Sequence, residues 1–112
     1  MIVRSAYLEG TVTEKDQPEF DRLMSTSVVG AIRTYPGIRD VRLRHIAEAD
    51  VGAPPIYVIF DLYFDSLDDM HAALASETRQ QVRDRIAQAM TLFKGRVYHL
   101  VFKEPKTSDL RS

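Results

Sequence analysis

The sequence contains no cysteine in its 112 residues. Without cysteine the chain forms no disulfides, offers no thiolate nucleophile and builds no cysteine-based metal site, and this composition is compatible with a reducing cytosol. An excess of one charge is also missing, because 15 basic residues balance 16 acidic residues to a formal net charge of −1. We therefore expect neither nucleic acid nor an anionic membrane as a partner.

Long apolar segments and nucleotide-binding motifs are missing too. No apolar run approaches the ~20 residues that a membrane helix needs, and the N-terminal residues do not form the basic patch and apolar segment of a signal peptide. The chain has no Gly-rich phosphate loop, no serine nucleophile elbow and no dinucleotide fingerprint. We therefore expect a cytoplasmic protein without a cofactor.

The composition that remains is that of an ordinary globular domain. Hydrophobic residues make up 45% of the chain and charged residues 28%. At this length we expect one domain over residues 1–104 and a polar tail over residues 105–112. Strands are predicted over 2–12, 38–46, 56–64 and 96–103, with helical segments between 16 and 35 and between 66 and 95.

Two capping boxes mark the starts of the helical segments. Asp16 is followed by Glu19, and Ser66 by Asp69, with the spacing that lets each pair cap a helix. Gly95 is expected to end the second helical segment. The resulting order, βαββαβ, predicts an α+β protein with a ferredoxin-like, four-stranded antiparallel sheet. In this arrangement both helical segments cover one face, and the first and third strands are central.

Both faces of the predicted sheet are apolar. On the third strand, alternation separates one set from another: Ile56, Val58, Phe60, Leu62 and Phe64 against Tyr57, Ile59, Asp61 and Tyr63. On the fourth strand the two sets are Tyr98, Leu100 and Phe102 against Val97, His99 and Val101. Because helices cover only one face, the other would leave a large apolar patch in water. We therefore predict a homodimer that pairs these open faces about a two-fold axis.

Three short segments carry a resemblance to a known family. They are Pro55–Val58 (PIYV), Leu62–Leu67 (LYFDSL) and Ala72–Ser76 (AALAS). With the element order and the length, they make residues 1–104 similar to the EthD-like family of the dimeric α+β barrel superfamily. The resemblance implies two ferredoxin-like subunits packed sheet to sheet around a pocket. Relatives in this superfamily include cofactor-independent monooxygenases, muconolactone isomerases and many proteins with no assigned reaction.

The first helical segment departs from this family pattern. EthD-like chains commonly carry an aromatic pair there, followed by a histidine and then a proline. Phe20 stays, but Leu23 and Met24 replace the aromatic pair, Val28 falls where the histidine would be, and Gly30 where the proline would be. If that histidine does chemistry in relatives, this chain cannot use the same group.

Asp61 and His99 are the candidate acid–base pair. Asp61 interrupts an apolar strand, and burying its carboxylate unpaired costs on the order of several kcal/mol. We expect it to face the pocket or the interface with a partner drawn from Arg4, Arg42, Arg44, His99 and Tyr7. Two interpretations stay open for Asp61: an intersubunit ion pair that fixes the dimer register, or a general acid or base opposite His99. His99 is in turn either a packed strand residue or a general base, since imidazole titrates near neutrality.

The remaining candidates are ligand-binding residues. They are Tyr7, Arg42, Arg44, Tyr57, Tyr63 and Tyr98. The tyrosines offer hydrogen bonds and flat surfaces to an aromatic or polycyclic ligand, and the arginines suit a carboxylate. Core packing and a solvated edge strand explain the same residues equally well. His45, His71 and His99 show no short metal-binding spacing, so we expect no metal.

Two functions fit the sequence. The first is a small cofactor-independent enzyme, of the isomerase or monooxygenase type, that acts on an aromatic or lactone-like catabolite by proton transfer through Asp61 and His99. The second is a non-catalytic ligand-binding or accessory protein of a degradation pathway, which the missing helix histidine favours. The sequence leaves open whether the protein is an enzyme.

Overall fold

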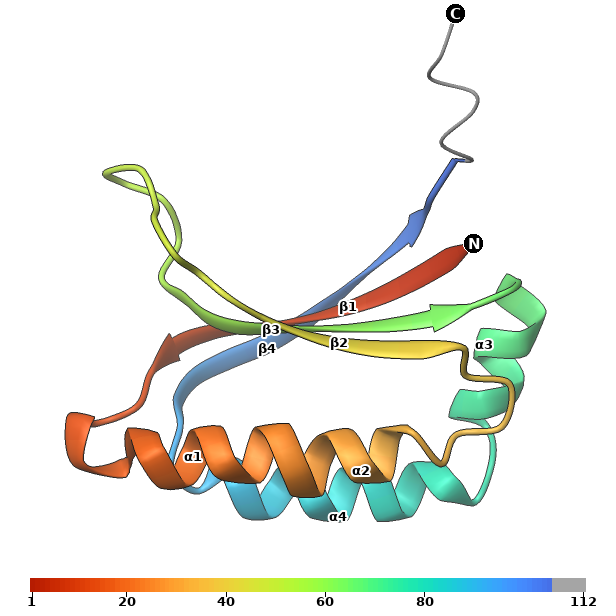
Figure 1. Ribbon diagram of the computed structural model, residues 1–112, viewed down its shortest axis with the longest axis horizontal. Helices are drawn as coiled ribbons and strands as arrows, with labels where there is room; N and C mark the ends of the chain where they lie inside the picture. The colour runs from red at the N-terminus through yellow and green to blue at the C-terminus, as the bar shows by residue number, and fades with distance from the viewer. Residues whose placement is uncertain (106–112) are drawn as a thin grey trace, which may run out of the picture.

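Four antiparallel strands form one sheet in the order β2-β3-β1-β4 (Figure 1). They are β1 (Ile2–Thr11), β2 (Asp40–His45), β3 (Ile56–Phe64) and β4 (Lys94–Lys103). The computed structural model describes residues 1–105, so the predicted polar tail lies outside the described residues except for Pro105. Strands β1 and β3 are central and β2 and β4 are edges, which confirms the ferredoxin-like α+β fold.

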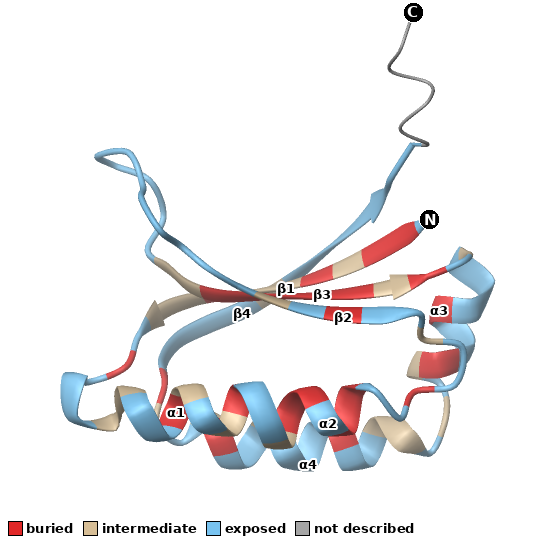
Figure 2. Ribbon diagram, viewed as in Figure 1, coloured by how far each residue is buried: buried red, intermediate tan, exposed pale blue. Residues whose placement is uncertain are grey.

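All helices lie on one face of this sheet (Figure 1). A 3-10 turn, η1 (Glu14–Asp16), leads into a helical rod made of α1 (Gln17–Leu23), a π-helical segment η2 (Met24–Val28) and α2 (Val29–Ile32). The second helical segment is α3 (Leu67–Leu74) and α4 (Thr78–Met90). The core fills the space between these helices and the sheet, as the buried residues in Figure 2 show.

The two predicted capping boxes differ in outcome. The Ser66 side chain accepts a hydrogen bond from the Asp69 N–H at 3.1 Å, so this cap is confirmed. The prediction that Asp16 caps the first helix is wrong. Asp16 has helical angles, φ −92° and ψ −12°, and its side chain accepts no hydrogen bond from the helix N-terminus. Its carboxylate instead accepts from the Thr13 hydroxyl at 2.9 Å. The preceding 3-10 turn causes this difference, since a capping residue normally has extended angles.

The η2 segment places one extra residue in the middle of the first helical rod. The Val29 N–H donates to the Met24 carbonyl, five residues back, instead of four. Two hydroxyl groups bind carbonyls in the same turn, with Ser25 Oγ 2.8 Å from the Asp21 carbonyl and Thr26 Oγ1 2.6 Å from the Arg22 carbonyl. Such hydroxyl-to-backbone bonds compete with the regular ladder and often accompany a distorted turn.

Strand β4 begins before the predicted boundary, because Gly95 belongs to it. Gly95 pairs with Gly10 of β1 instead of ending the helix. Both glycines have positive φ, 155° for Gly10 and 154° for Gly95, and a Cβ on Gly95 would lie 2.1 Å from the Glu9 carbonyl oxygen. The close backbone approach therefore requires glycine at this pair.

A β-bulge changes the direction of Tyr57. The register of the β1–β3 pair shifts so that Leu8 faces Val58 and Glu9 faces Ile56, which leaves Tyr57 without a partner. Tyr57 consequently turns to the helix side, where its hydroxyl donates to Asp21 Oδ1 at 2.8 Å. The prediction that Tyr57 shares a face with Ile59, Asp61 and Tyr63 is therefore wrong, because simple alternation does not account for a bulge.

Candidate functional site

A cavity of about 290 Å³ lies between the sheet and the helices. Its walls come from β1, β3 and β4 on one side and from α4, the η2 segment and α2 on the other. The apolar lining residues are Ala6, Leu8, Met24, Ile32, Phe60, Leu62, Val82, Ile86, Ala87, Met90 and Val97. A mostly apolar pocket of this kind, with a few polar groups at one place, is the usual form of a small-molecule site.

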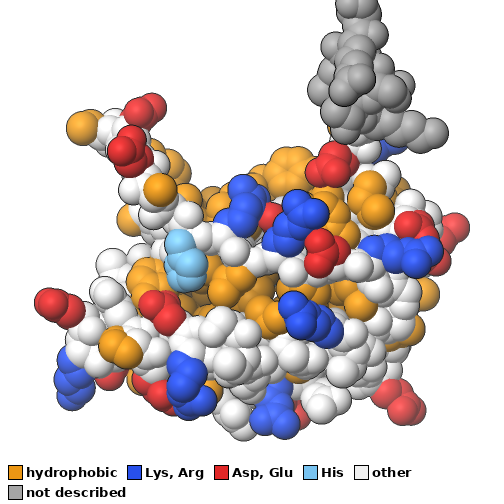
Figure 3. Space-filling view, viewed as in Figure 1, with side chains coloured by type: hydrophobic (Ala, Val, Ile, Leu, Met, Phe, Trp, Pro, Cys, Tyr) orange, Lys and Arg blue, Asp and Glu red, His pale blue; other side chains and the backbone are white. Residues whose placement is uncertain are grey.

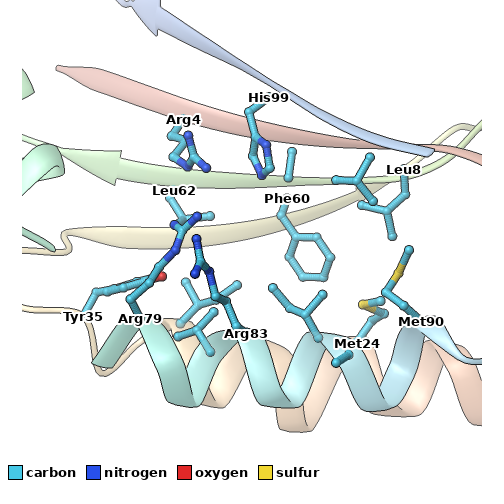
Figure 4. A pocket seen from close by; sticks show the side chains of 16 residues that line it. Arg4, Leu8, Met24, Tyr35, Phe60, Leu62, Arg79, Arg83, Met90 and His99 are labelled. Atoms are coloured by element: carbon cyan, nitrogen blue, oxygen red, sulfur yellow. The ribbon is translucent and has the colours of Figure 1, made fainter. Parts of the chain in front are cut away.

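Polar side chains gather at one end of the cavity. Arg4 and His99 point into it from the sheet, while Arg79 and Arg83 reach toward it from α4 (Figure 4). Arg4 alternates with Ala6 and Leu8 on the helix-facing side of β1, and His99 is the β4 residue opposite Ala6. Arg79 and Arg83 share one helix face because they are four residues apart. The fold therefore brings four basic side chains from three elements to one place.

The surroundings of His99 keep its ring neutral at pH 7. Partial burial, and then the positive charges of Arg4 and Arg79, lower the pKa of His99 to about 4, although the residue keeps an exposed surface on the edge strand β4. A neutral imidazole has one N–H donor and one nitrogen that accepts a proton. Within residues 1–105, Arg4, Arg79 and Arg83 form no salt bridge, whereas five other arginines do. His99 is therefore neutral at pH 7, and it accepts a proton less readily than a free imidazole because uncompensated positive charge lies beside it.

Asp61 lies on the opposite, open face of the sheet. Ser5 Oγ donates to Asp61 Oδ1 at 2.6 Å, and Arg44 Nη2 donates to the same oxygen at 3.1 Å. The carboxylate side chain is only 4% exposed. Within this chain the partner is Arg44, which is one of the expected partners, and the role of this ion pair at a subunit interface stays a prediction.

The structure does not bring Asp61 and His99 together. Ser5 pairs with Asp61 and its neighbour Ala6 pairs with His99, and successive residues of a strand point to opposite faces. Asp61 lines a hollow on the open face, and His99 lines the cavity under the helices. The two groups therefore cannot act as an acid–base pair on one bound molecule within a subunit.

Four of the predicted ligand-binding residues line the open-face hollow with Asp61: Tyr7, Arg42, Arg44 and Tyr63. The Arg42 guanidinium lies 4.8 Å from the centre of the Tyr63 ring, and Tyr98 stacks on Tyr7 at 5.2 Å between ring centres. Basic and acidic side chains lie close together along the β2 edge, between apolar areas (Figure 3). Tyr57 is not part of this group, because the bulge turns it to the helix side.

Sequence reasoning missed the basic end of the cavity. Arg79 and Arg83 resemble an ordinary solvated helix face in the sequence, and the sequence suggests Arg4 only as a partner of Asp61. Tyr35, which follows the first helical rod, is 4% exposed and also lines the cavity. The available signal was the alternation of Arg4 with Ala6 and Leu8, which places an arginine on an otherwise apolar strand face.

The first helical rod offers no substitute for the missing family histidine. Val28 is fully buried in the core and does not line the cavity, whereas Met24 does. The ring centres of His45 and Tyr57 lie 6.2 Å apart in a T-shaped arrangement, and His71 is exposed on α3. His99 is therefore the histidine that reaches the cavity.

Residues 1–105 contain no group of three or more His, Asp or Glu side chains placed to hold a metal ion. Over the same residues, no helix is long and apolar enough to cross a membrane. The expectations that the protein binds no metal and that it is cytoplasmic stay predictions.

No model of a known protein family matches the sequence, and no curated protein matches it. Solved structures do share the fold. An EthD family protein from Bacillus halodurans is similar with a TM-score of 0.70 at 19% identity, over 94% of this chain and 100% of that chain. A proposed antibiotic biosynthesis monooxygenase from Deinococcus radiodurans is similar with a TM-score of 0.63 at 16% identity, over 96% and 95% of the two chains.

A third similar structure is a variant of SnoaB, a cofactor-independent oxygenase from Streptomyces nogalater. Its TM-score is 0.61 at 15% identity, and the match covers 95% of this chain and 93% of that chain. At these identities the likeness shows the fold alone. It confirms the ferredoxin-like architecture and the resemblance of this fold to EthD-like proteins.

Proposed function

We propose that this protein is a homodimeric barrel protein that binds a small organic molecule in the cavity between sheet and helices and acts on it without a cofactor. The substrate class is an aromatic or lactone-like compound, and the reaction is of the isomerase or monooxygenase type. The observation that carries this proposal is His99, a neutral imidazole beside Arg4 at the polar end of an apolar cavity.

Proton transfer is the chemistry that this arrangement supports. The neutral ring of His99 takes a proton from an acidic carbon of the ligand, and the electron pair of that C–H bond moves onto the adjacent carbonyl oxygen. The positive charge at this end of the cavity then stabilises the negative oxygen that forms. Return of the proton to a different carbon completes an isomerisation. In a monooxygenation, the enolate carbon forms a C–O bond to molecular oxygen, and the resulting peroxide takes the proton from His99 to give a hydroperoxide. The hydroperoxide then loses water, with the second C–H proton, and leaves one oxygen atom on the ligand as a carbonyl group.

Asp61 takes a structural role in this proposal. Its carboxylate accepts hydrogen bonds from Ser5 and Arg44, so it joins three neighbouring strands across the open face. An acid–base assignment for Asp61 would require a ligand on the open face, where the carboxylate is already bonded to two groups. The proposed catalytic role therefore belongs to His99 alone.

The proposed homodimer pairs the open faces of two sheets. Strand β4 is exposed along its length (Figure 2), and on its open face Leu100 is 48% exposed and Phe102 42%. Val97 and Val101 on its other face are 39% and 44% exposed. A second copy of the chain would cover this apolar edge and close the two sheets into a barrel.

A non-catalytic ligand-binding or accessory protein is the second candidate. The position of the family histidine holds Val28, which is buried in the core, and this observation favours binding without reaction. The two candidates share the cavity and differ in whether His99 moves a proton.

Deuterium exchange at carbon distinguishes the enzyme from the non-catalytic binding protein. A panel of aromatic ketones and butenolides is incubated with the protein in D2O, and exchange at the acidic carbon is followed by NMR. We expect native protein and the Asp61→Asn variant to accelerate exchange and the His99→Gln variant not to. If the His99→Gln variant accelerates exchange as much as the native protein does, the catalytic role of His99 is overturned. Binding of panel members without exchange in the native protein would instead support the accessory protein.

A further inference from the structure

We propose that the ligand of this cavity is a carboxylic acid with a flat apolar body, and that Arg4 and Arg79 bind its carboxylate. This inference rests on the proposed function for the location of the ligand, and it adds the chemical class. The carboxylate lies at the polar end of the cavity, and the apolar body lies between Phe60 of the sheet and the methionines of the helical layer.

The charge at the polar end is uncompensated. Arg4 on β1 and Arg79 on α4 are both partly buried and approach the same space from opposite walls (Figure 4). Neither forms a salt bridge within residues 1–105. Burial and the charge of Arg79 lower the pKa of Arg4. Two partly desolvated cations without a counter-ion repel each other, so a bound anion removes an unfavourable interaction and adds a favourable one.

Carboxylate is the anion that fits the donors at this end. An arginine guanidinium binds a carboxylate through two parallel N–H···O bonds. The buried Tyr35 also lines this end of the cavity, and its hydroxyl makes no hydrogen bond to residues 1–105. It therefore offers one more donor for a carboxylate oxygen. Arg83, which is exposed, lies at the rim and adds positive charge.

The rest of the cavity selects the body of the ligand. Met24 and Met90 lie at the end away from the arginines, with Leu8 above them and the Phe60 ring between the two ends (Figure 4). Methionine and aromatic side chains pack well against flat rings. The volume of about 290 Å³ is at the small end of the range for small-molecule pockets, which suits a ligand of one or two rings.

Anchoring the carboxylate also sets the orientation of the ligand. His99 projects from β4 next to Arg4, so the carbon atoms nearest the carboxylate lie closest to the imidazole (Figure 4). The arginines and His99 thus have separate tasks. The guanidinium groups hold the acid, and the imidazole faces the adjoining carbon.

Matched fluorescent probes test this inference. We would measure binding of 2-naphthoate, 2-naphthamide and 2-naphthyl phosphate to the full chain by fluorescence titration. The acid and the amide have nearly the same shape and differ in charge. We expect the acid to bind at least about tenfold more tightly than the amide, the ratio that one charged contact supplies.

Three variants locate the anion site. Arg79→Met and Arg4→Met are each expected to remove the preference for the acid while binding of the amide stays unchanged. Arg85→Met is the control, because Arg85 is an exposed α4 residue that does not line the cavity. Without ligand, Arg79→Met is expected to raise the melting temperature, since it relieves the repulsion with Arg4. Arg79 lies on a helix surface, so this variant remains informative even if Arg4→Met fails to fold.

The outcomes are distinct. Equal binding of acid and amide overturns the carboxylate inference and leaves the proposed cavity intact. Tighter binding of the naphthyl phosphate than of the acid assigns the arginines to a phosphate ester and likewise overturns it. Failure of all three probes to bind at millimolar concentration contradicts both this inference and the proposed function. An acid preference that survives Arg79→Met and Arg4→Met shows that other residues bind the anion.

Discussion

Ser5 and Asp61 face each other across the β1–β3 ladder, and the Ser5 hydroxyl donates a 2.6 Å hydrogen bond to the Asp61 carboxylate. The second bond to this carboxylate comes from Arg44 on the outer strand β2. A buried carboxylate is tolerated on a central strand only with such partners. Ser5, Asp61 and Arg44 thus tie three strands together on the open face, at the place where sequence reasoning expected catalysis.

Replacing Arg44 by Met should destabilise the fold. The Asp61 carboxylate would keep only its bond to Ser5, and loss of a charged partner of a buried group costs about 1–3 kcal/mol in the free energy of unfolding. Urea denaturation measures the change. Arg42→Met is the control, because Arg42 forms an exposed ion pair with Asp40 on the same strand and should matter little. Equal effects of the two variants would contradict the structural role of Asp61.

Replacing Gly95 by Ala should also destabilise the fold. Gly95 has φ 154°, and a Cβ there would meet the Glu9 carbonyl oxygen at 2.1 Å, so the β1–β4 pair must separate locally. We expect a loss of more than about 2 kcal/mol in the free energy of unfolding. Gly30→Ala is the matched control: Gly30 lies in α2 with nothing within 4 Å of an added Cβ, and alanine there should stabilise by about 0.5–1 kcal/mol.

His99 should make the stability depend on pH. The unfolded ring titrates near its usual value of 6.5, whereas the cavity lowers the pKa of His99 to about 4. Between these values the unfolded chain binds more protons, so stability is complete above pH 6.5 and falls as the pH drops toward 4. The loss is about 1 kcal/mol, less than the full shift implies, because solvent reaches part of the ring.

Urea denaturation at a series of pH values checks this prediction, and His99→Gln is the comparison. The charged groups around the ring are Arg4, Arg79 and Arg83, which keep their charge over this range, so the difference between native and variant isolates the histidine. Parallel pH profiles for the two proteins would show that the ring is not held neutral in the native state.

The proposed dimer should be sensitive to charge on the open face. Leu100→Asp places a carboxylate in the predicted interface, so we expect this variant to sediment as a monomer at micromolar concentration, where the native protein is expected to be a dimer. Val51→Asp is the control, because Val51 is a fully exposed loop residue far along the chain from β4. A native protein that sediments as a monomer would contradict the barrel.

The sequence was most informative where local chemistry decides the structure. Strand β3 has the predicted bounds, since its apolar run ends at Asp65 and Ser66, and the Ser66 side chain caps the next helix as the spacing indicates. The assignment of His99 to the face of Val97 and Val101 is also correct, because β4 pairs regularly with β1 through this region. Period-two alternation works where the ladder has no bulge.

Long-range register decided what the sequence did not reveal. The direction of Tyr57 depends on the bulge in the β1–β3 pairing, and the sequence of either strand alone does not show where a bulge will form. The arginines of the cavity come from β1 and α4, far apart in the chain, so their convergence depends on how α4 lies under the sheet. Gly95 was misassigned for the same reason, because its need for glycine arises from Gly10 on another strand.

The wide turn at η2 lets the first helical rod keep a strict four-residue repeat. Phe20, Met24, Val28 and Ile32 are all buried, at 0%, 1%, 0% and 3% exposure. Along a regular α-helix a four-residue step drifts by about 40°, so three steps would carry the last contact about 120° away from the first. One extra residue in the η2 turn takes back about 100° of this drift. Deleting one residue there would leave eleven regular steps of about 100° between Phe20 and Ile32, so both side chains would keep facing the core. The η2 turn is therefore the place where the rod can lose a residue without reorienting either end, whereas regular winding at the present length would turn Phe20 about 100° away from the core relative to Ile32.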